Sequence, residues 1–325
     1  MAFEFGLIES LGEERTTKIL VRNQDNSGSK IGAIKVANEL LNQNVAALFG
    51  FSGSHDSVLV GKLVSGKNIL TIVPGSMHND LASFGDAFYT TGHSMDLEVQ
   101  NTIEFIDRTF PKARGAVIIN RYAVASSSAE KILIEKHLNN PRISLKLMYL
   151  NKDLNLDEVD LKFLRDGKFN FLYFTAYPEA MVNFANQLEK SNIDIPVVAA
   201  SSWGLGDSDL LRRFIVNKKS PLYFSTDWII HSKESKHFTN IFKLKFGKEP
   251  SPENALGYDL GKIVGETISR VEGSMTRASV LKAFKKNLCF ERLSVGRLCF
   301  METGGHSSIK PVFYQFKSDK SLRIQ

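Results

Sequence analysis

The amino-acid sequence predicts an α/β fold in which mostly parallel sheets are covered by helices. Two short apolar runs, 45–49 and 70–73, end at Gly50 and Pro74, as buried strands often do. A serine-bearing turn follows each run, and after the first turn apolar residues recur at helical spacing. The same order of strand, polar turn and helix returns further along the chain. Such alternation is typical of parallel sheets covered by helices.

The amino-terminal part of the chain follows this alternation. Apolar residues lie among Glu4, Glu9 and Glu13 at the start, which indicates an amphipathic helix. A polar turn over 23–29 then separates an apolar run from a helical pattern. We expect a helix over 3–11, strands over 17–22, 45–49, 70–73 and 87–91, and helices over 33–41, 52–64 and 78–82.

A second α/β series begins after a break at 92–96. The run 247–252 contains Gly247, Pro250 and Pro252, which end one helix and begin a long one. We expect strands over 115–119, 144–149, 171–175, 196–200 and 222–225, helices over 99–109, 127–137, 178–191, 207–214, 237–246, 253–271 and 279–287, and closing β segments over 298–300 and 312–316.

Composition excludes several classes of protein. The chain has 325 residues, 43% hydrophobic and 23% charged, which is enough for two globular domains. The net charge of +6 comes from scattered residues, with pairs such as Lys285-Lys286 but no basic stripe, so we expect no nucleic-acid partner. No apolar run reaches the roughly 18 residues of a membrane span, and the first residues do not resemble a signal peptide. Cys289 and Cys299 either pair or remain free buried thiols.

The turns after the first two apolar runs are candidate ligand contacts. In a parallel sheet both turns lie at the carboxyl edge, where open α/β sheets bind ligands. Hydroxyls and helix-start N–H groups suit a carboxylate or another acceptor-rich group. Each serine is also a candidate for an ordinary helix cap. The candidate residues are Ser52, Gly53 and Ser54 in the first turn, and Gly75, Ser76 and Met77 in the second.

Six motifs in order resemble those of type 1 periplasmic binding proteins, the leucine/isoleucine/valine-binding branch of ABC transporter substrate-binding proteins. They include VAALFGFSGS, ILTIVPGS, INRYAVASSSAEKI and FLYFTAYPEAMVNFANQLEK. The resemblance implies two Rossmann-like lobes, 1–92 plus 228–302 and 93–227 plus 303–325, joined by three crossing strands that act as a hinge. It implies an extracytoplasmic protein, periplasmic or extracellular, that captures a small ligand between the lobes for the transporter's membrane subunits, without cofactor or metal.

The resemblance also assigns ligand contacts in the second lobe. Tyr122 and Tyr177 match tyrosines that pack over the ligand, and Ser202, Trp203 and Asp227 follow later strands. Family members that bind amino acids place a carboxylate near 201–203 to pair with the ligand ammonium, and this chain has none there. Either Asp207 or Asp227 takes that role or the ligand lacks an ammonium. We favour the second alternative, an aromatic acid, an amide or another small organic anion.

The amino end departs from the family as well. No strand precedes the first helix, so either 3–8 is itself that strand or the first lobe is short by one element.

Nucleotide-binding, hydrolase and zinc-protease motifs are missing, and the seven histidines lack metal-ligand spacing, although His55 and His78 adjoin the candidate turns. We therefore expect no enzyme activity. A ligand-sensing or regulatory module of the same fold, and a degenerate non-binding member, are the alternatives.

Overall fold

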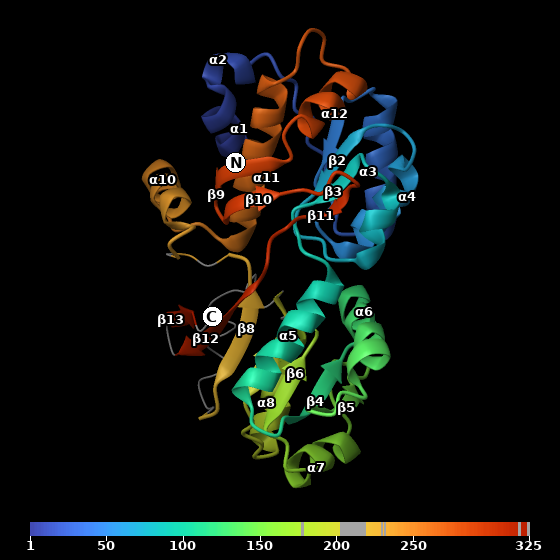
Figure 1. Ribbon diagram of the computed structural model, residues 1–325, viewed down its shortest axis with the longest axis vertical. Helices are drawn as coiled ribbons and strands as arrows, with labels where there is room; N and C mark the ends of the chain where they lie inside the picture. The colour runs from blue at the N-terminus through green and yellow to red at the C-terminus, as the bar shows by residue number, and fades with distance from the viewer. Residues whose placement is uncertain (177–178, 202–218, 229, 231, 318–319, 324–325) are drawn as a thin grey trace. The chain divides into compact units, whose positions relative to one another are not determined.

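The computed structural model describes the chain except residues 177–178, 202–218, 229, 231, 318–319 and 324–325 (Figure 1). It divides into two compact units, Met1–Ser94 with Trp228–Ile309, and Met95–Asp227 with Lys310–Gln325. The chain passes from one unit to the other three times. The third passage comes after Ile309, later than the expected boundary at 302/303, because Gly305–His306 pairs with a strand of the first unit.

The first unit contains a parallel sheet in the order β1-β2-β3-β11. Its strands are short: β1 (Ala47–Phe49), β2 (Leu70–Val73), β3 (Phe88–Thr90) and β11 (Gly305–His306). All four side chains of β2 are buried. Apolar residues on both faces explain why these runs are continuous rather than alternating in polarity. The predicted α/β class with parallel, helix-covered sheets is confirmed.

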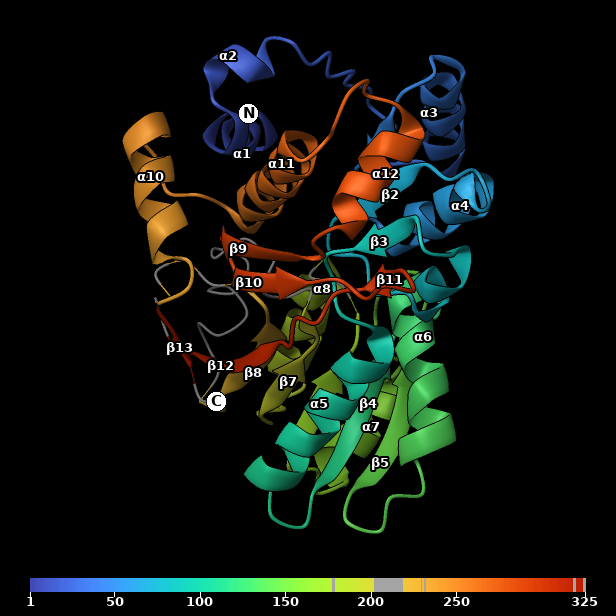
Figure 2. The same cartoon turned by 45° about the horizontal axis from the view of Figure 1, so that its top comes forward.

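Helices cover both faces of this sheet (Figure 2). One face packs against α3 (Lys30–Asn42), α4 (Ser54–Val64) and the 3₁₀ helix η1 (Asn79–Phe84). The other packs against α1 (Ala2–Leu11), α11 (Pro252–Ser269) and α12 (Arg277–Lys285). The remaining helices of the unit are α2 (Glu13–Thr16) and α10 (Lys236–Phe246).

A disulfide joins the two strands of a hairpin in the first unit. Strands β9 (Cys289–Leu293) and β10 (Gly296–Cys299) are antiparallel, and Cys289 and Cys299 are register partners. The buried Asp259 of α11 accepts hydrogen bonds from the Ser294 N–H at 2.5 Å and from its hydroxyl at 2.6 Å, which fixes the turn of the hairpin. Of the two alternatives left by the sequence, pairing of the cysteines is the one observed.

The second unit is built on a longer sheet in the order β13-β12-β8-β7-β6-β4-β5. From β8 to β5 neighbouring strands are parallel, whereas β12 and β13 are antiparallel to their neighbours. The strands are β4 (Arg114–Ile119), β5 (Ser144–Tyr149), β6 (Phe171–Phe174), β7 (Val197–Ala199), β8 (Leu222–Thr226), β12 (Val312–Lys317) and β13 (Lys320–Arg323). The helices are α5 (Met95–Thr109), α6 (Val124–Ile132) with its π-helical continuation η2 (Leu133–His137), α7 (Glu158–Asp166) and α8 (Glu179–Lys190).

Several expected elements differ from the structure. The predicted strand over 17–22 is wrong, because residues 17–19 lie in a turn and a bend after α2 and residues 20–22 are not paired with any strand of the described chain. The alternative strand over 3–8 is also wrong, since those residues belong to α1. The prediction omitted α7, β9, β11 and β13. The helix expected over 207–214 lies outside the described residues.

Candidate functional site

In the first unit, the turn after β1 leads directly into the amino end of α4. Phe51 has a left-handed backbone (φ 61°), which turns the chain sharply after the strand. Ser52 and Gly53 are exposed, and Gly53 is the N-cap of α4. Ser54 is buried as the first helical residue. A helix start of this kind presents N–H groups without intrahelical acceptors, together with the positive end of the helix dipole.

The second predicted turn, after β2, is held tightly by its neighbours. Gly75 has φ 70°, and its N–H donates to Thr91 Oγ1 at 3.0 Å, so this N–H is not an open donor. Ser76 is only 1% exposed, and its carbonyl accepts a hydrogen bond from Thr90 Oγ1 at 2.7 Å. Met77 is half-buried beside it.

A serine that the sequence analysis did not single out joins the two turns. Ser57, fully buried in the first turn of α4, has its Oγ 2.6 Å from Ser76 Oγ and 2.9 Å from the carbonyl oxygen of Gly53. The structure therefore brings 52–54 and 75–77 together through a buried hydroxyl pair. In the sequence, Ser57 shows only as a serine one helical turn after the N-cap. Nothing there distinguishes it from an ordinary helix residue.

The polar loop 23–29 reaches the same edge of the sheet. Asn26 Nδ2 donates to Asp56 Oδ2 at 2.8 Å, and Asp56 lies in the first turn of α4. This carboxylate partly offsets the positive helix end, while the amide of Asn26 satisfies one of its oxygens.

Imidazoles gather beside the second turn. His306, on β11, lies against the backbone of Met77 and His78, and burial, with further contributions from His93 and His78, lowers its pKa to about 4. Burial also lowers the pKa of His78, whose Nδ1 accepts the N–H of Asp80 at 3.2 Å and so caps η1. At neutral pH both rings are uncharged, and His78 has a structural role as a helix cap.

In the second unit, the turn after β4 also leads into a helix whose buried serine contacts a hydroxyl at the end of a neighbouring strand. Tyr122 follows Asn120, whose side-chain oxygen accepts the Tyr122 N–H at 3.0 Å, and the tyrosine is 64% exposed. Ser126 in α6 is fully buried, with its Oγ 2.5 Å from Thr175 Oγ1 at the end of β6. A serine one turn into a helix again links the ends of two neighbouring strands.

An ion pair next to Tyr122 was not anticipated from the sequence. Arg121 contacts both carboxylate oxygens of Glu130, with Nη2 2.6 Å from Oε1, and its guanidinium carbon lies 3.8 Å from the centre of the Tyr149 ring. Glu130 is largely buried, and the hydrogen bonds from Arg121 lower its pKa. The pair fixes the backbone that presents Tyr122.

A buried carboxylate lies at the ends of β7 and β8. Glu98 of α5 accepts the Ser201 N–H at 2.8 Å and the Ser225 hydroxyl at 2.7 Å. The predicted Asp227 follows β8 and is half-buried. Three other predicted contacts, Tyr177, Ser202 and Trp203, lie outside the described residues.

Comparison with known proteins identifies the family. The family described as Periplasmic binding protein matches residues 8–320. The chain belongs to this family. The resemblance inferred from the motifs is thereby confirmed, and the family is one of binding proteins rather than a class of enzymes. No curated protein sequence matches the chain.

Solved structures share this periplasmic binding protein fold. A leucine binding protein from Thermotoga maritima has a TM-score of 0.79 and 18% identity, covering 100% of this chain and 94% of its own. A branched-chain amino acid transporter substrate binding protein from Streptococcus pneumoniae, in complex with isoleucine, has a TM-score of 0.80 and 16% identity, covering 99% of this chain and 94% of its own. A solute binding protein of an ABC transporter from R. palustris, in complex with benzoate, has a TM-score of 0.76 and 14% identity, covering 99% of this chain and 90% of its own.

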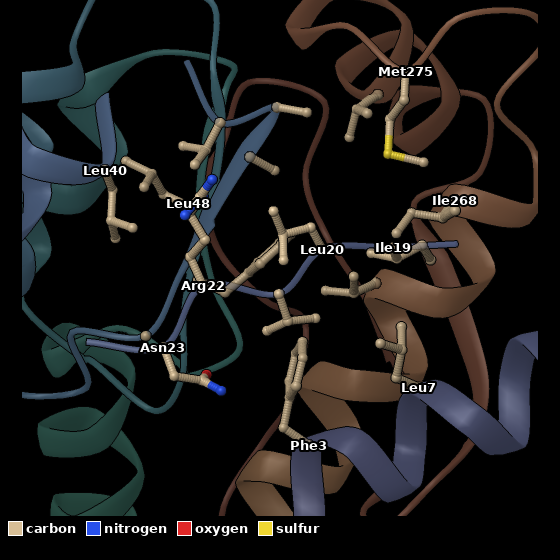
Figure 3. A pocket seen from close by; sticks show the side chains of 18 of the residues that line it. Phe3, Leu7, Ile19, Leu20, Arg22, Asn23, Leu40, Leu48, Ile268 and Met275 are labelled. Carbon is tan, nitrogen blue, oxygen red and sulfur yellow. The ribbon is translucent and has the colours of Figure 1, made fainter. Parts of the chain in front are cut away.

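Three further observations concern the described part of this periplasmic binding protein. No group of three or more histidine, cysteine or acidic side chains there is arranged to hold a metal ion. No described helix combines the length and apolar character of a membrane span. A cavity of about 480 Å³ lies in the first unit along β1, and none of the predicted site residues lines it (Figure 3).

Proposed function

We propose that this periplasmic binding protein is an extracytoplasmic solute-binding protein that delivers a small organic ligand to the membrane subunits of an ABC transporter, without chemical change to the ligand. The observation that carries the proposal is the exposed Ser52-Gly53 turn at the amino end of α4, anchored to the second turn by the Ser57–Ser76 hydroxyl pair. The Tyr122 turn of the second unit is proposed as a ligand contact as well.

The chemistry of the first turn favours a carboxylate or another oxygen-rich group on the ligand. The first N–H groups of α4 and the Ser52 hydroxyl are donors, and the helix dipole adds positive potential. Solved neighbours include one in complex with isoleucine and one in complex with benzoate, so both amino acids and aromatic acids are within the chemistry of this fold. Glu98 already accepts hydrogen bonds from Ser201 and Ser225, and the sequence has no carboxylate at 201–203. We therefore favour an acid or amide without an ammonium group.

The disulfide supports a location outside the cytoplasm. Bonds such as Cys289–Cys299 persist in oxidising compartments and are rare in reducing ones. A periplasmic or extracellular location agrees with a role in supplying a transporter.

A thermal-shift screen tests the proposal. Purified protein is heated with benzoate, other aromatic acids, short-chain acids, amides, leucine and isoleucine, each over a concentration series. A ligand that binds only the folded state raises Tm as its concentration exceeds Kd. We expect aromatic or aliphatic acids to raise Tm more than the amino acids do. If no class shifts Tm, capture of a small solute is wrong for this chain.

A charge placed in the first turn locates the site. Ser52→Asp puts a negative charge where the ligand's acidic group should bind, so we expect affinity for the best ligand of the screen to fall about tenfold or more by calorimetry. Ser52 is exposed, so Tm without ligand should change little. The matched control is Ser144→Asp, at an exposed serine at the start of β5. Equal affinities for the two variants would place the site elsewhere.

A further inference from the structure

Strand β11 is short and lies at the edge of the first unit's sheet, beside β3 (Figure 2). It consists of Gly305 and His306, which pair with Tyr89 and Thr90. A ladder of this length contains few backbone hydrogen bonds, and each contributes little to stability. Contacts outside the ladder are therefore needed to hold β11 against the sheet.

Ser307 supplies two such contacts. Its N–H donates to the Gly92 carbonyl at 3.1 Å, and its buried hydroxyl donates to the Thr91 carbonyl at 2.7 Å. The hydroxyl of Thr91 in turn accepts the Gly75 N–H at 3.0 Å. The end of β11 is thus connected, through the residues that follow β3, to the second candidate turn at 75–77.

The His306 ring connects β11 to the same turn directly. It makes hydrogen bonds with the backbone of Met77 and His78. Its Nε2 atom is buried and has no hydrogen-bond partner within the described part of the chain. A neutral imidazole has one N–H, whereas a charged imidazole has an N–H on both nitrogens. Protonation of His306 in this position would bury a second donor without an acceptor, which is costly.

The side chains that lower the pKa of His306 are themselves imidazoles. They are His93, in the segment after β3, and His78 in the second turn. His78 in turn faces one carboxylate and two further basic groups, Asp80, Lys62 and His55. Burial, with a smaller contribution from His93, lowers the pKa of His306 to about 4. The ring therefore takes up a proton more readily once it has left these surroundings.

We propose that His306 is a positioning residue that holds β11 and the second turn together only while its ring is uncharged. Acid then releases β11 and loosens the turn at 75–77 before the rest of the first unit unfolds. Because this turn is a candidate ligand contact, solute capture should weaken over the same pH range. That last consequence alone rests on the function proposed above.

Hydrogen exchange without ligand tests the proposal, so that the result does not depend on solute capture. The reporters are the amides of Gly75 and Ser307. Corrected for intrinsic exchange, their protection should fall about tenfold or more from about pH 7 to about pH 5, because the released ring regains an ordinary pKa. The Thr71 amide of β2, which donates to the Ala87 carbonyl at 2.8 Å, is the reference and should stay protected. An equal fall at Thr71 would mean that the unit opens as a whole, and the proposal would be wrong.

Two variants show whether His306 is the group that responds to acid. His306→Gln keeps a side-chain N–H donor but cannot gain a proton, so the protection of Gly75 and Ser307 should be the same at both pH values. His237→Gln, at an exposed position on α10, is the matched control and should keep the wild-type fall. A fall in His306→Gln as large as that of the wild type would overturn the proposal.

A titration of the wild-type protein decides the question if His306→Gln folds poorly. The His306 ring is followed by NMR as the pH is lowered. We expect its midpoint below about 5.5, because the folded surroundings resist the charge. A midpoint near the ordinary value of about 6.5 would show that the folded strand and turn tolerate a charged ring, which contradicts the proposal.

Discussion

Two buried serines, Ser57 and Ser126, make the same kind of hydroxyl contact, one in each unit. Each lies one turn into the helix that follows a strand, and each places its hydroxyl against a hydroxyl at the end of the neighbouring strand, Ser76 or Thr175. Small hydroxyl side chains can join two turns there because both strands end at the same sheet edge. The exposed neighbours Ser52 and Tyr122 are thereby held on fixed backbones.

Removal of one hydroxyl from the first pair should be costly. Ser57→Ala leaves the buried Ser76 hydroxyl without its side-chain partner, so we expect the free energy of unfolding to fall by about 1–3 kcal/mol. The double variant Ser57→Ala with Ser76→Ala should lose less than the sum of the single losses, because the hydroxyls interact. Urea unfolding of the wild type, the two single variants and the double variant measures this interaction energy. Strict additivity would show that the pair contributes no coupling.

The partly buried His306 should make stability depend on pH. Its pKa of about 4 lies below the ordinary value near 6.5, so the unfolded chain binds more protons between these values. The resulting stability is fully present above pH 6.5 and is lost as pH falls towards 4, by up to about 3 kcal/mol. Unfolding at a series of pH values should show a shallower loss for His306→Gln. The exposed-site control His237→Gln should keep the wild-type slope.

At the scale of elements, α1 packs against α11 through glycines. A Cβ on Gly6 would lie 2.2 Å from the Tyr258 carbonyl oxygen, and one on Gly261 would lie 2.1 Å from that of Phe3. Glu9 adds a polar link, accepting from the Tyr258 hydroxyl at 2.9 Å and lying 3.3 Å from Lys262 Nζ. The two helices therefore approach closely enough for backbone contact, and this contact fixes where α1 begins relative to β1.

A methyl group at this contact should separate the helices. Gly261→Ala is expected to lower the free energy of unfolding by about 1–3 kcal/mol, because backbone rather than a flexible side chain must move. Gly257→Ala, on the same helix, places its Cβ 3.4 Å from the Ala2 Cβ and should be neutral or slightly stabilising, since alanine favours helix. Thermal and urea unfolding distinguish the two. A similar loss for both would contradict the packing argument.

At the scale of the whole molecule, the chain forms two units, each with its own buried apolar core. The first unit is built from two segments that are distant in the sequence. Its helices α1 and α11 therefore meet although they are about 250 positions apart, as the Ser10–Lys262 hydrogen bond illustrates.

Calorimetry should resolve the unfolding of the two units. Without ligand we expect two unfolding transitions, of which Gly261→Ala lowers only the one that belongs to the first unit. Saturating ligand should raise the transition of the first unit, because the proposed contacts of the Ser52 turn form only in its folded state. A single transition that Gly261→Ala shifts as a whole without ligand would show that the units unfold together.

The sequence by itself determined the α/β class, most strands and helices, and the family, because apolar periodicity and turn residues are local signals. It also located the turns at 52–54, 75–77 and 122. Only the tertiary structure decided that Gly75 donates its N–H to Thr91, that Ser57 and Ser126 bridge neighbouring turns, and that Glu98 is occupied by Ser201 and Ser225. Residues 17–22 show the reason most clearly. Their short apolar run of β-branched and aliphatic residues is typical of a strand, but a strand exists only where a neighbouring backbone satisfies its hydrogen bonds, and that is a property of the folded chain.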